Sequence, residues 1–177
     1  MVLENILLEN KVTILKRWLD LILETYPGDA ATLLRKDRNH FANPVGSTIS
    51  QEIEALFKGL LENKGPEVLS ASLDSILKIR SVQDFSPSEA VGFVFLLKKA
   101  IGETLKSQTY EEPVRDEWLK FYSKIDELAL LGFDIYMNCR EKICEIRVNK
   151  AQAEREMAFK MMERMAYSRE KPEEGGD

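Results

Sequence analysis

Six prolines divide this chain into segments whose apolar residues recur every three or four positions, and this combination limits it to helical folds. The prolines are Pro27, Pro44, Pro66, Pro87, Pro113 and Pro172. A spacing of three and four places apolar side chains on one face of an α-helix, and proline fits the first turn of a helix but not its interior. No segment alternates apolar and polar residues as a strand would. The sequence therefore predicts an all-α fold of about six helices with a long C-terminal helix.

Capping residues mark where several of these helices begin. Asn43 is placed to cap a helix that has Pro44 in its first position. Ser86 and Glu89 fit a reciprocal capping box, again with proline, Pro87, in the first turn. The segment after this box is apolar nearly all round and is predicted to be the central helix of the core. The helices predicted before Pro113 cover about 3–25, 29–36, 44–62, 66–79 and 87 onward.

The end of the chain predicts one very long helix, or two in tandem with a kink near Gly132, because no proline falls between Pro113 and about Tyr167. A heptad-like seam, weakened at Lys150 and Ala153, runs along its second half at Tyr136, Cys139, Ile143, Ile146, Ala153 and Met157. We interpret this seam as a dimer helix, and a solvated helical tail is the alternative. The predicted organisation is a helical domain over 1–138, the dimer helix over 139–168 and a disordered tail over 169–177.

Composition indicates a globular protein of the reduced cytoplasm. The 177 residues carry a formal net charge of -5, which favours neither nucleic acid nor anionic lipid as a partner. No apolar run is long enough to span a membrane, and charged residues interrupt the first helix where a secretory leader would be apolar. Cys139 and Cys144 match no zinc or thioredoxin spacing. Buried structural thiols are expected, and a redox-sensing pair across a dimer is the alternative.

Residues for catalysis or cofactor binding are scarce. His40 is the one histidine, and it falls in a predicted loop rather than on an apolar helical face, so neither a catalytic triad, a di-iron site nor a haem ligand is favoured. The glycines form no phosphate-binding loop. We therefore expect no enzyme activity, no metal and no cofactor.

Arginines and aromatic residues near the first loop form the single constellation of chemical interest. Guanidinium groups beside aromatic faces hold small anions or stack on a protein partner. The alternative is that the tryptophan belongs to the core and the neighbouring arginine is solvated. The candidate ligand or partner surface comprises Arg17, Trp18, Tyr26, Arg38, His40 and Phe41.

Three blocks, in order, resemble the RsbRD N-terminal domain family, the N-terminal domains of RsbR-type co-antagonists. They are the segment from Leu8 through Arg17-Trp18 to Tyr26-Pro27, the segment Asp37-Arg38-Asn39-His40-Phe41-Ala42-Asn43-Pro44-Val45-Gly46, and the segment from Phe85-Ser86-Pro87-Ser88 to Lys98. The resemblance covers about 3–153. It implies a globin-like helical fold without haem that dimerises through its last helix and serves as the sensory half of stress-signalling proteins.

The resemblance leaves two kinds of function open. In the family's stressosome members a STAS output domain follows the long helix, whereas this sequence stops at Asp177, so we expect a stand-alone, non-catalytic sensory module. Such a module would form a homodimer, contact an unknown protein partner and respond to an unidentified small molecule. The alternative is an adaptor for a larger metabolic or redox complex, with the Met-rich end of the last helix docked into its partner.

Overall fold

The computed structural model describes residues 2–36, 43–83, 85–105 and 114–170, and these residues form helices joined by turns. The helices are α1 (Val2–Glu9), α2 (Lys11–Glu24), α3 (Gly28–Lys36), α4 (Pro44–Leu61), α5 (Pro66–Ser81), α6 (Pro87–Gly92), α7 (Leu96–Leu105) and α8 (Arg115–Glu170). No strand occurs within the described ranges. The all-α prediction is therefore confirmed, with eight helices in these ranges in place of about six. The single helix predicted over 3–25 is two helices, α1 and α2, which are separated at Asn10.

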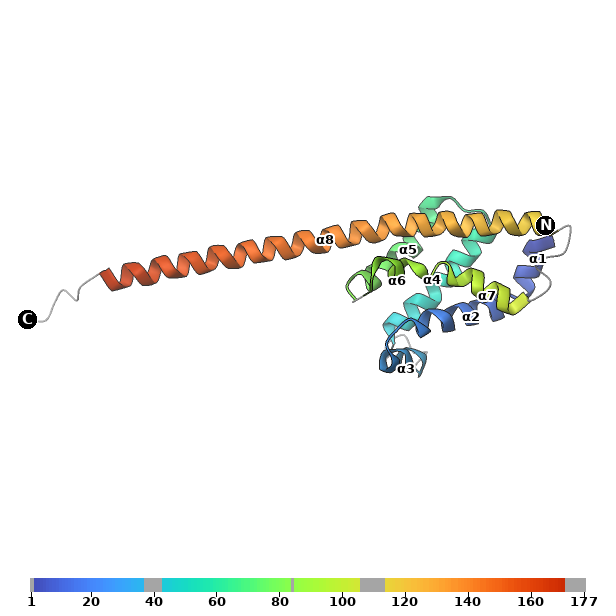
Figure 1. Ribbon diagram of the computed structural model, residues 1–177, viewed down its shortest axis with the longest axis horizontal. Helices are drawn as coiled ribbons and strands as arrows, with labels where there is room; N and C mark the ends of the chain where they lie inside the picture. The colour runs from blue at the N-terminus through green and yellow to red at the C-terminus, as the bar shows by residue number, and fades with distance from the viewer. Residues whose placement is uncertain (1, 37–42, 84, 106–113, 171–177) are drawn as a thin grey trace, which may run out of the picture. The chain divides into compact units, whose positions relative to one another are not determined.

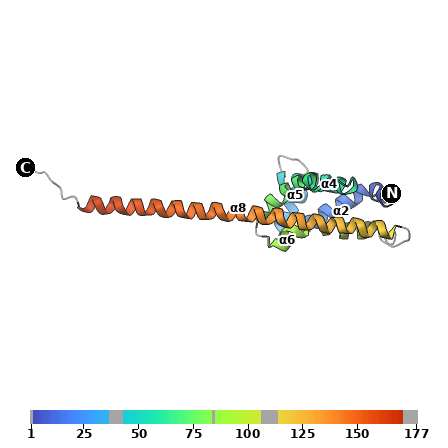
Figure 2. The same ribbon diagram turned by 90° about the horizontal axis from the view of Figure 1, so that it is seen from above.

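The chain divides into two compact units, Met1–Cys139 and Arg140–Asp177. In the first unit α2 packs against α7 and α4 packs against α5. Figure 1 draws α2 beside α7, and Figure 2 draws α4 beside α5. Residues 169 and 170 belong to α8, and the rest of the predicted tail, 171–177, lies outside the described residues.

The predicted helix starts are found where the capping residues placed them. Asn43 caps α4, since its Oδ1 accepts a hydrogen bond of 2.8 Å from the Gly46 amide. At α6 the full capping box is formed: the Glu89 amide donates to the Ser86 hydroxyl, and the Ser86 amide donates to the Glu89 carboxylate over 2.8 Å. These bonds satisfy amides that the first turn of a helix leaves without partners.

The predicted central helix is not one helix but two, because the chain leaves α-helical geometry after Gly92. The amides of Val94, Phe95 and Leu97 bond to carbonyls three residues earlier. The carbonyl of Phe93 is thereby left for another donor, and the indole Nε1 of Trp18 donates to it over 2.8 Å. The break between α6 and α7 thus gives the most buried tryptophan a hydrogen-bond partner.

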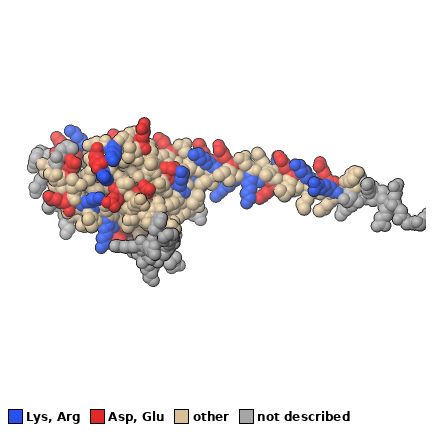
Figure 3. Space-filling model, turned by 180° about the vertical axis from the view of Figure 1, so that it is seen from behind, with Lys and Arg blue, Asp and Glu red and all other residues tan. Residues whose placement is uncertain are grey.

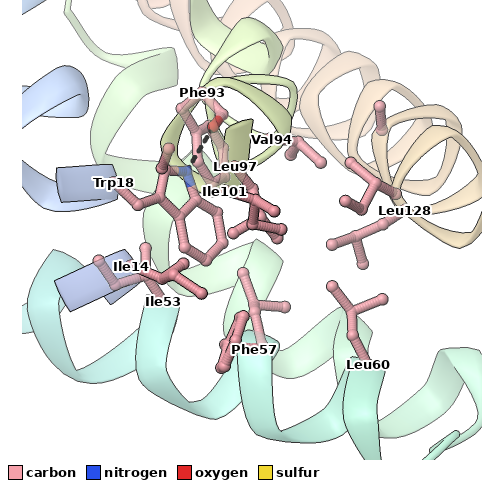
Figure 4. Close-up of a cluster of buried hydrophobic side chains, with 14 of the residues drawn as sticks. Ile14, Trp18, Ile53, Phe57, Leu60, Phe93, Val94, Leu97, Ile101 and Leu128 are labelled. Carbon is pink, nitrogen blue, oxygen red and sulfur yellow. Dashed lines mark hydrogen bonds between the residues drawn. The ribbon is translucent and has the colours of Figure 1, made fainter. Parts of the chain in front are cut away.

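The core of the first unit surrounds this tryptophan. Trp18, Phe57, Phe93, Ile14 and Ile53 are all essentially inaccessible to solvent. Figure 4 shows their side chains converging from α2, α4 and the α6–α7 turn, with the Trp18 to Phe93 bond drawn as a dashed line. Each such side chain contributes about 1.5–3 kcal/mol to folding by leaving water. Trp18 is therefore a core residue.

Helix α8 is continuous through Gly132, so the prediction of one long helix is confirmed over the alternative of a kinked pair. A Cβ added at Gly132 would lie 3.6 Å from side-chain atoms of Leu77 and Val91 and 3.8 Å from Leu73. Gly132 is therefore the position at which α8 approaches α5 and α6 within the first unit.

A candidate functional site around a buried arginine

Arg80 near the end of α5 is a completely buried arginine, with 0% of its surface exposed. It continues the apolar face of α5, because Leu73, Ile76, Leu77 and Arg80 follow one another at steps of three, one and three. Arginine is almost never fully buried unless it is paired with an acidic group. A guanidinium group at the end of an apolar face therefore indicates a site rather than ordinary core.

Three aromatic rings enclose the guanidinium group. Its central carbon lies 4.1 Å from the ring centroid of Phe85, 5.2 Å from that of Tyr26 and 5.8 Å from that of Phe93. Tyr26 and Phe85 also contact each other edge to face, with centroids 5.2 Å apart. The negative faces of aromatic rings attract cations, by about 2 kcal/mol where water is excluded. The rings come from the turn after α2, the α5–α6 connection and the α6–α7 turn.

One nitrogen of Arg80 makes both of its hydrogen bonds. Nη2 donates to the Thr25 hydroxyl over 2.9 Å and to the Glu89 backbone carbonyl over 3.2 Å. The Thr25 hydroxyl in turn donates to the Ile22 carbonyl over 2.7 Å. Nε and Nη1 of Arg80 and the buried Tyr26 hydroxyl make no further hydrogen bond of ordinary geometry among the described residues, but the Tyr26 hydroxyl and the guanidinium group interact directly. All acceptors of Arg80 are neutral, so its charge is not balanced by a direct ion pair there.

Burial and electrostatic attraction have opposite effects on the pKa values of Arg80 and Tyr26. Burial lowers the pKa of the Arg80 guanidinium, and the nearby Tyr26 and, more weakly, Glu89 oppose that change. Burial likewise raises the pKa of the Tyr26 phenol, against the attraction of Arg80. Arginine is in effect always protonated in proteins, so Arg80 carries a positive charge. The site therefore holds one positive charge next to the Tyr26 hydroxyl, inside a cluster of aromatic rings.

A hydrogen bond connects this site to α8. The Tyr136 hydroxyl donates to the backbone carbonyl of Phe85 over 3.3 Å. Tyr136 is 1% exposed, and the Phe85 ring is the one nearest the Arg80 charge. A change in the position of Phe85 therefore acts on both Arg80 and α8.

The structure brings one residue of the sequence-predicted surface into this site and places two others elsewhere. Tyr26 faces Arg80, whereas Trp18 lies in the core. Arg17 is on the surface of the unit, where Nε bonds to the Glu103 carboxylate over 2.5 Å and Nη1 to the Glu24 carboxylate over 3.4 Å. These carboxylates raise the pKa of Arg17, the Glu103 hydrogen bond most of all. Arg38, His40 and Phe41 lie outside the described residues.

The predicted dimer helix falls into two parts. Tyr136 and Cys139 are buried within the first unit, at 1% and 8% exposure. Ile143 is half-buried, and Ala153 is exposed. Ile146 and Met157 are 66% and 68% exposed. Cys139 is a buried free thiol, as expected, whereas Cys144 is an exposed one, so the expectation of buried thiols is wrong for Cys144. The part of the seam that is open to a second chain therefore starts at Ile143.

Two clefts line the first half of α8 within the first unit. One has a volume of about 350 Å³ and lies against the α4–α5 turn, and the other, of about 250 Å³, lies against α1. They share Leu60, Asn63 and Lys124, and Lys124 donates a hydrogen bond to the Asn63 side chain across the boundary. Glu117 and Glu127 stand beside the lysines of these clefts. The clefts are lined by apolar residues together with both lysines and glutamates, and this lining favours neither an anionic nor a cationic ligand.

Within the described ranges no three side chains of His, Cys, Asp or Glu come together in a group that could hold a metal ion. Among the helices described there, none is long and apolar enough to cross a lipid bilayer.

The protein is an all-α domain. Its last helix, α8, continues in sequence to Glu170, whereas the last buried residue in it is Cys139. The chain belongs to the family described as the RsbT co-antagonist protein rsbRD N-terminal domain, which matches residues 12–149. The family predicted from the three sequence blocks is thereby confirmed. An uncharacterized protein of Archaeoglobus fulgidus is 28% identical over 153 residues, which cover 82% of this chain and 87% of that protein. No solved structure matches the chain, so the globin-like arrangement stays a prediction.

Proposed function

We propose that this chain is a non-catalytic sensory domain of the cytoplasm that forms a homodimer through residues 143–165 of α8 and passes a regulatory signal along that helix. The family match supports a role related to RsbT co-antagonists. The globin-like, haem-free character implied by the resemblance belongs to the same proposal. In this role a ligand or partner favours one packing of the first unit and shifts the population of dimer arrangements.

The observation that carries the dimer is the exposed apolar seam of the second unit. Ile146, Met157, Met161 and Met165 expose 60–68% of their surface and recur along one side of α8. A helix in which no residue from 144 to 167 is buried has no core of its own, and isolated helices are marginal in water. Pairing two such helices buries the seam in both chains at once.

The charged residues fit the same arrangement. Lysines, arginines and acids are interspersed along this part of α8, as Figure 3 shows. Lys150 pairs with Glu154 on its own helix, with 3.8 Å between Nζ and Oε1. The long stem of Lys150 can therefore cover the seam while its ammonium group remains solvated. A polar residue at one seam position also fixes the register of paired helices at some expense of stability.

Light scattering on the full chain tests the proposal. Ile146→Glu places a charge in the seam and should weaken dimerisation by about a hundredfold or more. Val148→Glu is the matched control, because Val148 is 54% exposed and lies about 200° around the helix from Ile146. The expected result is a dimeric wild type and V148E and a monomeric I146E. A wild type that is monomeric at tens of micromolar, or equal effects of both variants, would contradict the proposal.

A second candidate function, an adaptor for a larger complex, has one observation in its favour. Phe159 and Met162 are 56% and 58% exposed and lie off the seam, so a two-helix dimer would leave them in water. Exposed methionines adapt to varied partner surfaces. Met162→Glu should abolish partner capture and preserve the dimer if the adaptor function holds, and it should change neither if it does not.

A further inference from the structure

The exposed seam of α8 is nearly symmetric about its centre. Within the second unit it consists of Ile143, Ile146, Lys150, Ala153, Met157 and Met161, which follow one another at steps of three, four, three, four and four. Ile146, Met157 and Met161 are 62–68% exposed. On either side of a point between Ala151 and Gln152, the seam therefore runs outward from a lysine or an alanine to two large apolar residues.

A parallel pair of such helices would place each seam residue beside its own copy. The two Lys150 ammonium groups would then meet in one layer, where like charges repel each other. The two Ala153 side chains would meet in the next layer, and their small volume would leave the interface poorly filled. Parallel pairing thus brings both weak positions of the seam together in adjacent layers.

An antiparallel pair combines unlike residues in each layer. With a twofold axis between Ala151 and Gln152, Ile146 lies opposite the partner's Met157, and the outermost layers combine isoleucine with methionine in the same way. Lys150 lies opposite the partner's Ala153. The long stem of the lysine can fill the space beside the small alanine while its ammonium group reaches water. The two lysines of the dimer then occupy different layers.

The charges beside the seam also distinguish the two orientations. Arg147 and Glu154 lie on one flank, about 100° and 80° around the helix from Ile146 in the same direction, and Lys142 lies on the other flank. In an antiparallel pair equal flanks face each other, so Arg147 meets the partner's Glu154, and the twofold axis repeats this contact. In a parallel pair opposite flanks face each other, so Arg147 meets the partner's Lys142 and is repelled.

The flank of Lys142 adds little to this preference. In the antiparallel pair Lys142 lies between the partner's Glu156 and the partner's Lys160, so attraction and repulsion offset each other there. The preference for the antiparallel orientation therefore comes from the Arg147 contact and from the layers that contain Lys150.

We propose that the partner of the exposed seam is a second copy of this chain in antiparallel orientation, with Arg147 of each copy paired with the partner's Glu154. This inference rests on the proposed dimer and names the geometry of its interface. Glu154 already accepts from Lys150 of its own helix, with 3.8 Å between Nζ and Oε1. The partner's Arg147 thus completes a group of charges at the centre of the seam. Each pair of contacts occurs twice, so the interface is closed and self-complementary.

Charge reversal in the full chain tests the orientation, with the dimer Kd measured by sedimentation equilibrium. Arg147→Glu should raise Kd about tenfold in an antiparallel dimer, because it faces the partner's Glu154 twice, and should lower Kd in a parallel dimer, because it faces the partner's Lys142. Adding Glu154→Arg should restore the Kd of the wild type. Arg155→Glu is the control, since Arg155 lies about 180° around the helix from Ile146 and carries the same change of charge.

Spin labels measure the orientation directly. In a Cys144→Ser background, in which the remaining Cys139 is buried, single cysteines replace Gln152 or Ala166, and electron spin resonance measures the distance between the two labels of a dimer. Labels at Gln152 should lie about 25–30 Å apart in either orientation, because this residue is close to the twofold axis. Labels at Ala166 should lie about 50 Å apart in the antiparallel dimer and about 25–30 Å apart in a parallel one.

The outcomes separate this inference from the proposed function. A weaker R147E dimer that E154R restores, together with the long distance at residue 166, supports the antiparallel pair. A stronger R147E dimer, equal Kd values for R147E and R155E, or the short distance at residue 166 would overturn it and leave the proposed dimer intact. The absence of any coupling between labels at residue 152, with a monomeric wild type, would overturn the proposed dimer and the inference together.

Discussion

The hydroxyl group of Tyr136 donates a hydrogen bond to the backbone carbonyl of Phe85, over 3.3 Å between residues 51 positions apart in the chain. Phe85 lies in the connection between α5 and α6, and Tyr136 is in α8. The bond satisfies a carbonyl in a segment that is not helical, where no regular backbone donor exists. It therefore fastens the α5–α6 connection, and with it the ring that covers Arg80, to the long helix.

Tyr136→Phe should reveal the contribution of this bond. The variant keeps the buried ring and removes only the hydroxyl, so the free energy of unfolding should fall by about 1 kcal/mol and Tm by about 2–4 °C. Thermal unfolding followed by circular dichroism measures both. Tyr167→Phe is the control, because Tyr167 is 68% exposed on the same helix and its loss should leave Tm unchanged. Equal Tm values for Y136F and the wild type would show that the bond adds no net stability.

The sequence was informative where a structure depends on neighbouring residues. Asn43 with Pro44, and Ser86 with Glu89, predicted the starts of α4 and α6, and both caps are formed. Such signatures can be found in the sequence because donor and acceptor lie within one turn of each other. The absence of proline likewise predicted either one long helix or a pair kinked near Gly132, and α8 is the former.

The sequence was not informative where partners come from distant segments. Arg80 is preceded by Leu73, Ile76 and Leu77 at helical spacing, which was a detectable sign of burial. Part of what surrounds Arg80, however, comes from a turn far away in the chain, that of Thr25 and Tyr26. The break after Gly92 could not be predicted for the same reason. It allows the Phe93 carbonyl to accept a hydrogen bond from Trp18, which is distant in the sequence.

Steps of three and four also do not reveal which protein chain covers a helical face. Tyr136 and Cys139 have the same spacing as Ile143 and Ile146, yet the first two are buried inside the first unit and Ile146 is 66% exposed. Periodicity indicates that one face of a helix is apolar and is buried in a contact. It does not indicate whether the same chain or a second chain makes that contact. This difference is why the proposed dimer is tested at Ile146 and not at Tyr136.

Two glycines should respond to alanine with opposite signs. A Cβ at Gly46 would overlap the Asn43 side-chain amide, which caps α4 and also donates to the Leu34 carbonyl over 2.6 Å. Gly46→Ala should therefore lower the free energy of unfolding by about 1–3 kcal/mol. Gly102 in α7 has nothing within 4 Å of such a Cβ, so Gly102→Ala should raise it by about 0.5–1 kcal/mol. Urea unfolding of both variants measures the difference, and changes of the same sign would contradict this account of the cap.

The capping box of α6 should make stability depend on acid pH. Hydrogen bonds from the Ser86 side chain and backbone, with a smaller attraction from Arg80, lower the pKa of Glu89 in the folded chain. A carboxyl whose folded pKa is depressed stabilises the fold above its unfolded pKa, and this contribution is lost as pH falls through the folded pKa. Glu89→Gln retains an acceptor for the Ser86 amide but not the charge. The Tm gap between wild type and E89Q should be open at pH 7 and close below about pH 4.5. A gap that stays constant between pH 7 and 3 would contradict the role of the charge.

The two tryptophans offer a matched test of what a buried hydrogen bond contributes. Trp18 and Trp118 are 0% and 4% exposed. The Trp18 indole N–H donates to the Phe93 carbonyl over 2.8 Å, whereas that of Trp118 has no acceptor among the described residues. Trp18→Phe leaves a cavity and an unpaired carbonyl in the α6–α7 turn, and should lower the free energy of unfolding by about 2–4 kcal/mol.

Trp118→Phe also removes volume, but it removes a buried donor that the described residues leave unpaired, so the two effects oppose each other. Its cost should be about 1 kcal/mol or less. Trp118 packs edge to face against Phe121, with centroids 6.5 Å apart, and phenylalanine can retain such a contact. Urea unfolding followed by circular dichroism, which does not depend on tryptophan fluorescence, compares the two variants. A W118F variant as unstable as W18F would show that volume, and not the hydrogen bond to Phe93, dominates both sites.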